Sequence, residues 1–145
     1  MIQIKHKTTG AVLHVVNANT LAGEDLSGLD LEGADLSGAD LSRANLTGAN
    51  LRSADLEGAN LLDADLSCAD LDGANLYHAD LPRAYLCGAN LSGSDLSCAN
   101  LTCADLSGAN LYRAALAGAY LSGTDLTAAN LLGCLGLPKG LNTTV

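Results

Sequence analysis

Leucine occupies every fifth position of this chain from residue 21 to residue 131, which gives 23 consecutive leucines. From Leu26 onward, the residue two places before leucine is Ala in 18 of 22 units, and the residue one place before is Asp or Asn in 19 of 22. The two residues after leucine are mostly small, polar or charged. The unit is therefore A-(D/N)-L-x-x, and the fold must accommodate it many times over.

A period of five fits neither regular secondary structure. In an α-helix, one such unit turns the chain by about 500°, so the leucines would spiral around every side. In a flat strand, an odd period sends alternate leucines to opposite faces. Identical units can all bury leucine only if each turns the chain by the same angle around a shared axis. The repeat therefore predicts a solenoid with Leu and Ala inside.

Charge pairing indicates how many units close one coil, because stacked coils lie about 4.8 Å apart and like charges at that distance repel. At a spacing of four pentapeptides, the charged positions after leucine form four pairs of opposite sign, Glu32–Arg52, Arg52–Asp72, Arg43–Asp63 and Asp63–Arg83. Spacings of three and of five pentapeptides each give one pair, and both pairs are of like charge. Four pentapeptides per coil are favoured, which implies a square cross-section.

The interior of such a coil is narrow, which accounts for the absence of Phe and Trp from a chain that is 48% hydrophobic. A large residue in the alanine column would overpack the tube. Ser94 and Thr124 replace Ala in that column, and we expect their hydroxyls to bond the backbone.

The run from Ala34-Asp35-Leu36-Ser37-Gly38 to Ala129-Asn130-Leu131-Leu132-Gly133 resembles the pentapeptide repeat family. The resemblance covers residues 19–133 and implies an all-β fold, a right-handed quadrilateral β-helix with four pentapeptides per coil. With that closure, residues 24–133 would make about 5.5 coils and a rod roughly 26 Å long.

The two ends depart from the repeat, and an open solenoid end needs a cap. We expect residues 1–18 to form a β-hairpin cap with its turn near Thr9-Gly10, which would place Ile4 opposite Val15 and His6 opposite Leu13. Residues 134–145 should form a C-terminal cap and tail, a loop or single helical turn from Leu135 to Leu141 with residues 142–145 loose.

Neither catalysis nor cofactor binding is indicated. The three histidines, His6, His14 and His78, do not cluster with a nucleophile, and a filled solenoid offers no concave site for convergent groups. The five cysteines lack zinc-ligand spacing and are Cys68, Cys87, Cys98, Cys103 and Cys134. Cys68 and Cys87 could approach disulfide distance on neighbouring coils, although small outward residues in a reducing compartment explain them equally simply. We expect no enzyme activity, cofactor or metal.

Charge is distributed unevenly along the rod. Residues 24–80, the acidic half, carry 13 acids and two Arg, whereas residues 81–133, the neutral half, carry three acids and two Arg. The acidic half could bind a basic partner, and the neutral half carries outward tyrosines that could form a second contact surface. The acids could equally serve only to bond local backbone and keep the rod soluble. The candidate interaction residues are Glu57, Asp63, Asp65, Asp70 and Asp72 in the acidic half, and Tyr85, Tyr112, Tyr120 and Leu132 in the neutral half.

Two functions remain open. The first is a protein-binding or scaffold module without catalysis, acting on an unknown protein partner as a monomer or an end-to-end homodimer. The second is implied by the resemblance, since some pentapeptide repeat proteins mimic DNA and modulate type II topoisomerases. The net charge of −9 argues against direct binding to nucleic acid or to an anionic membrane. Because no apolar run is long enough for a membrane span and the N-terminus lacks a signal-peptide pattern, we expect a cytoplasmic location.

Overall fold

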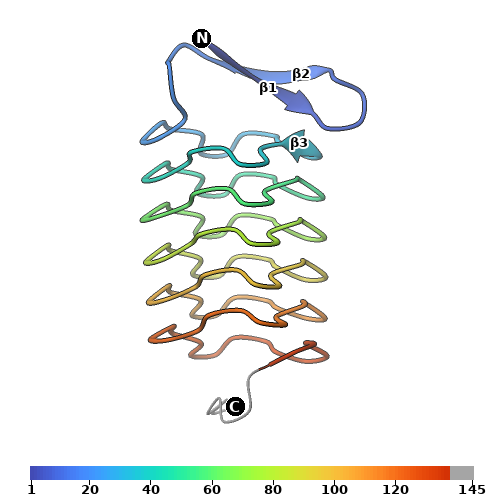
Figure 1. Cartoon of the computed structure of the whole chain (residues 1–145), viewed down its shortest axis with the longest axis vertical. Helices are drawn as coiled ribbons and strands as arrows, with labels where there is room; N and C mark the ends of the chain where they lie inside the picture. Colours follow the sequence, from blue (N-terminus) through green and yellow to red (C-terminus); the bar gives the residue numbers. More distant parts are fainter. Residues whose placement is uncertain (138–145) are drawn as a thin grey trace.

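The computed structural model describes residues 1–137 as a stack of similar coils closed at one end by a hairpin (Figure 1). Its strands are β1 (Ile2–His6), β2 (Val12–Val16) and β3 (Ala34–Asp35), and the described residues contain no helix. The remaining repeats are joined by isolated parallel bridges between residues four pentapeptides apart, from Asp25↔Asn45 to Ala115↔Leu135. Each coil therefore takes four pentapeptides, as the charge pairing predicts.

At each bridge, backbone hydrogen bonds connect one coil to the coil before it and to the coil after it. Leu26 N donates to Asn45 O at 2.7 Å, and Asn45 N donates to Glu24 O at 2.9 Å. The same pattern recurs at each later Asp or Asn position, so the backbone groups of one coil are satisfied by its two neighbours. Parallel pairing along the whole stack is what holds successive coils in register.

Each pentapeptide turns the chain with a β-turn that begins at leucine. In one example, Ala34 N donates to Leu31 O at 3.0 Å and the third residue of the turn, Gly33, has φ +64°. Because φ is positive at the third residue and not at the second, Glu32, the turn is of type II, which favours glycine at the third position. This requirement explains why the position two after leucine is so often Gly.

Leucine and alanine fill the interior. Every leucine of the repeat from Leu26 to Leu116 is at most 2% exposed, and most residues of the alanine column are equally buried. Ser94 replaces alanine while buried, and its Oγ donates to Leu91 O at 2.8 Å. Thr124 Oγ1 donates to Leu101 O at 2.7 Å, so both expected backbone bonds are confirmed.

The N-terminal hairpin covers the first coil. Strand β1 lies between β2 and β3, and it pairs antiparallel to both. Ile4 and Val16 turn inward and are 2% and 6% exposed. The imidazole of His6 lies directly over Gly33, where an added Cβ would be only 2.5 Å from Nε2. A side chain at that turn would therefore require the His6 ring to move.

The register of the hairpin differs from our expectation. Ile4 pairs with His14 rather than Val15, and Lys5 pairs with Val12, so His6 does not face Leu13. A bulge at Leu13 leaves two residues of β2 opposite one of β1 and moves the pairing one residue back toward the expected register. The cause of the difference is the connection, which spans residues 7–10 rather than a tight turn at Thr9-Gly10, because His6 N donates to Ala11 O at 2.8 Å.

At the opposite end, the parallel pairing continues to Leu135. Leu121, Leu126 and Leu131 are only half-buried, because no further coil stacks on them within residues 1–137. Most of the expected C-terminal loop or helical turn, and the expected loose tail, lie outside the described residues.

Candidate functional site

Outward side chains belong to three positions of each unit, the Asp or Asn before leucine and the two residues after it. The Asp or Asn oxygen typically accepts the backbone N–H two residues later, as Asp65 Oδ1 does from Ser67 N at 2.9 Å. Asn side chains also donate one coil back, for example from Asn90 Nδ2 to Asp70 Oδ1 at 2.8 Å. These local bonds orient the polar column and leave only some of its charge available to a partner.

The structure separates the five acidic candidates into paired and unpaired groups. Arg52 reaches Asp70 at 3.2 Å and Asp72 at 2.7 Å, and Arg83 holds Asp63 at 2.8 Å through two parallel hydrogen bonds. Within residues 1–137, neither Asp65 nor Glu57 forms an ion pair.

Two of the four stacked charge pairs predicted from the sequence, Arg52–Asp72 and Asp63–Arg83, are therefore present as ion pairs. Among the described residues, Glu32–Arg52 and Arg43–Asp63 do not come within ion-pair distance. The Arg52 guanidinium turns instead toward the two acids of the following coil, Asp70 and Asp72.

Hydrogen bonds and charge set the pKa values on this surface. The bond from Arg83 is the main cause of the lowered pKa of Asp63, and the bond to Asp63 raises the pKa of Arg83. The pKa of Arg52 is raised chiefly by its bond to Asp70. Away from these ion pairs, bonds from the residue two positions on lower the pKa of Asp25, Asp35, Asp40 and Asp125. The carboxylates are thus stabilised as anions.

One face of the rod carries acids but no Lys or Arg. This Tyr77 face consists of residues 34–38, 54–58, 74–78, 94–98 and 114–118, and its acids are Asp35, Asp55, Glu57 and Asp95. The face two pentapeptides away along each coil also lacks Lys and Arg, whereas the remaining two faces contain the arginines of the repeat.

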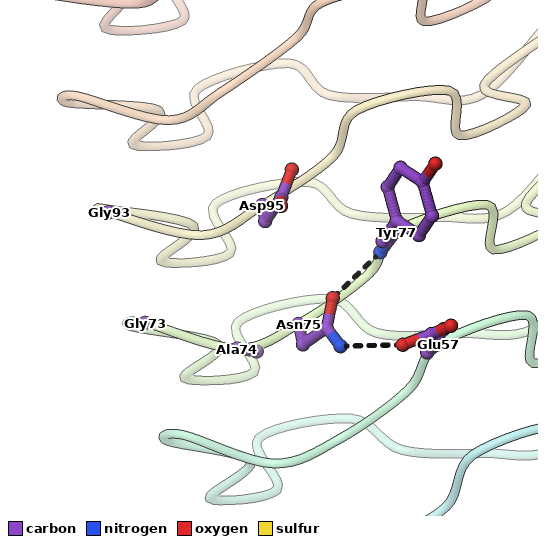
Figure 2. A pocket seen from close by; sticks show the side chains of 7 residues that line it. All are labelled: Glu57, Gly73, Ala74, Asn75, Tyr77, Gly93 and Asp95. Carbon is purple, nitrogen blue, oxygen red and sulfur yellow. Dashed lines mark hydrogen bonds between the residues drawn. The ribbon is translucent and has the colours of Figure 1, made fainter.

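A shallow cavity of about 480 Å³ lies on the Tyr77 face and its adjoining corner. Figure 2 shows the side chains of Glu57, Tyr77 and Asp95 around it, contributed by three successive coils. Asn75 lies at its centre, where Nδ2 donates to Glu57 Oε2 at 3.3 Å and Oδ1 accepts from Tyr77 N at 3.1 Å. Gly73, Ala74 and Gly93, which lack bulky side chains, line the side of the cavity away from Tyr77 (Figure 2).

Sequence reasoning included Glu57 but missed the other side chains around this cavity. Tyr77 follows Glu57 by one coil, and Asp95 follows Asn75 by one coil. Once four pentapeptides are known to close a coil, the sequence alone could have indicated that these side chains stack near one another. The decisive missing information was the concavity, which depends on three coils together.

The neutral-half candidates do not form one patch. Tyr112 and Leu132 lie one above the other in the same column, because Arg113 N bonds Leu132 O at 3.0 Å. Tyr85 and Tyr120 belong to two other faces and are 54% and 65% exposed, and Leu132 is 69% exposed. The Arg113 guanidinium lies over the Tyr112 ring, 4.9 Å from its centroid.

All five cysteines are free thiols. Cys68 Sγ faces the Gly88 position one coil on, where an added Cβ would lie 3.7 Å away. Cys134 takes an alanine-column position, its Sγ donates to Leu111 O at 2.9 Å, and burial raises its thiol pKa. Over residues 1–137, no group of three or more His, Cys, Asp or Glu side chains is arranged to hold a metal ion.

Comparison with known proteins agrees with this architecture. A family model for pentapeptide repeats matches residues 25–63, 44–83, 69–107 and 104–134, in eight copies. The chain belongs to the pentapeptide repeat family. No curated protein matches it in a sequence search. Within the described part of the chain, no helix is long and apolar enough to span a membrane.

Solved pentapeptide repeat proteins resemble this family member over most or half of its length. One from Nostoc PCC 7120 is 47% identical over 52% of this chain and 62% of its own, with a TM-score of 0.51. Rfr23 from the cyanobacterium Cyanothece 51142 is 37% identical over 72% of this chain and 65% of its own, with a TM-score of 0.47. The chain thus spans less than two thirds of either relative.

A third similar structure is QnrB1, a plasmid-mediated fluoroquinolone resistance protein. It is 22% identical over 82% of this chain and 77% of its own, with a TM-score of 0.45. At that identity, the likeness concerns the repeat fold and does not extend to function.

Proposed function

We propose that this pentapeptide repeat protein is a non-catalytic binding or scaffold module that recognises a basic segment of a partner protein through its acidic half. The observation that carries the proposal is the Tyr77 face, where Asp55 and Glu57 of the acidic half, and Asp95 just beyond it, form no ion pair within residues 1–137. Acids already neutralised by Arg52 and Arg83 offer less to a partner. Unpaired carboxylates on a rigid face instead provide electrostatic complementarity, which favours fast and selective association.

Rigidity supports the same proposal. Each coil is bonded to its neighbours along its whole length, so the acidic side chains keep fixed spacings of one coil. A partner with basic residues at a matching spacing would bind without the entropic cost of ordering the surface. The buried Leu and Ala columns can maintain this surface without contributing to recognition.

Affinity capture from a lysate of the organism that encodes the chain tests the proposal. One variant converts Asp55, Glu57 and Asp95 to the corresponding amides, and the matched control converts Asp25, Asp65 and Asp105 on the other face without Lys or Arg. We expect partners to be lost with the first variant and kept with the second, both with unchanged circular dichroism. Equal retention by both variants would contradict the acidic-face proposal.

The second candidate is a DNA-mimicking modulator of a type II topoisomerase or another DNA-binding protein. It is supported by the net charge of −9 and is weakened by the confinement of that charge to one half. A gyrase supercoiling assay tests it directly. Inhibition or protection at micromolar protein would favour it over the basic-peptide proposal, and no effect would remove it.

We also propose the geometry of the coil, the division of the chain into segments, its location and its oligomeric state. The coil is right-handed and quadrilateral with about 5.5 turns, as the family resemblance implies, and the chain divides into a cap at 1–18, a β-helix at 19–133 and a C-terminal cap and tail at 134–145. The protein acts in a bacterial cytoplasm. It works as a monomer or as an end-to-end homodimer, which solution mass and scattering length would distinguish.

A further inference from the structure

We propose that the cavity beside Tyr77 is the subsite for an arginine side chain of the partner. This inference rests on the proposed function and places recognition of the basic segment at the end of the acidic half, where the cavity also includes Gly93 and Asp95 of the neutral half. The cavity has a volume of about 480 Å³, which is in the range of small-ligand sites. Tyr77, which lines it, is 37% exposed. Its walls include carboxylates from two different coils, Glu57 and Asp95.

The chain itself shows how a tyrosine at this repeat position receives a guanidinium. Tyr112 directly follows a leucine, as Tyr77 does, and the guanidinium of Arg113 lies 4.9 Å from its ring centroid. At Tyr77 the next residue is His78, whose ring meets the tyrosine edge to face at 4.2 Å and 71°. Within residues 1–137 no Lys or Arg lies over the Tyr77 ring. Because His78 holds the side that Arg113 takes at Tyr112, a cation from outside would stack on the opposite side of the Tyr77 ring.

The polar groups around the ring select for a fork of N–H donors. Among the described residues, Glu57 accepts only the long 3.3 Å bond from Asn75 Nδ2, and one Asp95 oxygen accepts from Ser97 N at 2.9 Å. Each carboxylate therefore retains lone pairs for further donors. A guanidinium can stack on the ring while its N–H groups reach carboxylates to either side, whereas a compact ammonium cannot do so bidentately. Gly73 and Gly93 at the side of the cavity leave space for the methylene stem.

The test is a titration of ¹⁵N-labelled protein with hexa-arginine, using the backbone amides of Gly73 and Gly93 as local reporters. Hexa-citrulline, which has the same shape without charge, is the control ligand. We expect saturable shifts at both glycines with hexa-arginine and none with hexa-citrulline. Tyr77→Phe should preserve binding, and Tyr77→Ala should raise the dissociation constant about two- to fivefold, the effect of one exposed cation–π contact.

Two charge-matched variants separate this subsite from general attraction. Glu57→Gln and Asp65→Asn change the net charge equally, but only Glu57 borders the cavity. We expect Glu57→Gln to weaken hexa-arginine binding more than Asp65→Asn, with both proteins folded by circular dichroism. Equal effects of these two variants, or unchanged binding by Tyr77→Ala, would overturn the subsite while leaving an acidic-surface function standing. If the wild-type protein shows no binding at all, the basic-partner function itself fails.

Discussion

Ten residues other than glycine occupy the left-handed position two after leucine, and Ala128 is the simplest of them. Its φ is +58° and its side chain is an exposed methyl group. The left-handed conformation costs an L-residue about 1–2 kcal/mol, so Ala128→Gly should relieve that strain. Glycine also increases the entropy of the unfolded chain, which removes about 0.4–1 kcal/mol of the gain. We expect a net stabilisation of roughly 0.8 kcal/mol.

The reverse substitution provides the control. Gly38 has φ +62°, and a Cβ added there would meet no atom within 4 Å. Gly38→Ala therefore introduces only the backbone strain, and it should destabilise the protein by a similar amount. Urea unfolding with an unchanged slope would measure both effects. In thermal unfolding, a change of about 1 kcal/mol corresponds to about 2–4 °C at this chain length.

A third variant applies the same test to an exposed residue in a coil away from the ends of the rod. Ser53 has φ +53°, and its coil has a neighbour on each side. Separate fraying of the last coil therefore cannot mask a change in stability caused by Ser53. Ser53→Gly should also stabilise. If Ala128→Gly and Ser53→Gly both lower stability, or if Gly38→Ala raises it, the type II turn cannot be the reason for glycine in this column.

Three more predictions concern the interior, the polar column and pH. Leu76→Arg should prevent folding, because Leu76 is fully buried and the free-energy cost of burying an unpaired charge exceeds the stability of most domains. As the control, Leu76→Met should remain folded by circular dichroism. Asn90→Asp should cost at least about 1 kcal/mol in urea unfolding by replacing a donor to Asp70 with a like charge; unchanged stability would refute this. Because Arg83 lowers the pKa of Asp63 below 3.8, their pairing should stabilise the fold at pH above about 4 and be lost at lower pH. Thermal melts from pH 6 to 2 should show a smaller decline for Asp63→Asn, and an identical decline would contradict it.

The coil could be predicted from sequence because one rule repeats. A single buried position, Leu, recurs often enough for charge pairs such as Arg52–Asp72 to fix the closure at four pentapeptides. The hairpin has no such repetition. Its alternating pattern is compatible with more than one register, and that pattern signals neither the loop at residues 7–10 nor the bulge at Leu13.

The candidate site was predictable only in part for a related reason. The sequence shows which residues are acidic, but not which acids are neutralised. Asp70 and Asp72 are adjacent candidates by composition, yet both are bound by Arg52, whose direction depends on its rotamer. The cavity beside Tyr77 depends on the relative heights of side chains on three coils, which no linear pattern specifies.

Because four pentapeptides close one coil, the length of the rod and the direction of its binding face can change independently during evolution. Duplicating four consecutive pentapeptides anywhere within the parallel stack lengthens the rod by one layer and returns every later side chain to its original face. Duplicating only one pentapeptide preserves the leucine interior but moves every later side chain to the neighbouring face. A chain of this kind can therefore evolve a longer span without altering its binding face, or turn that face relative to its capped end without acquiring a new core.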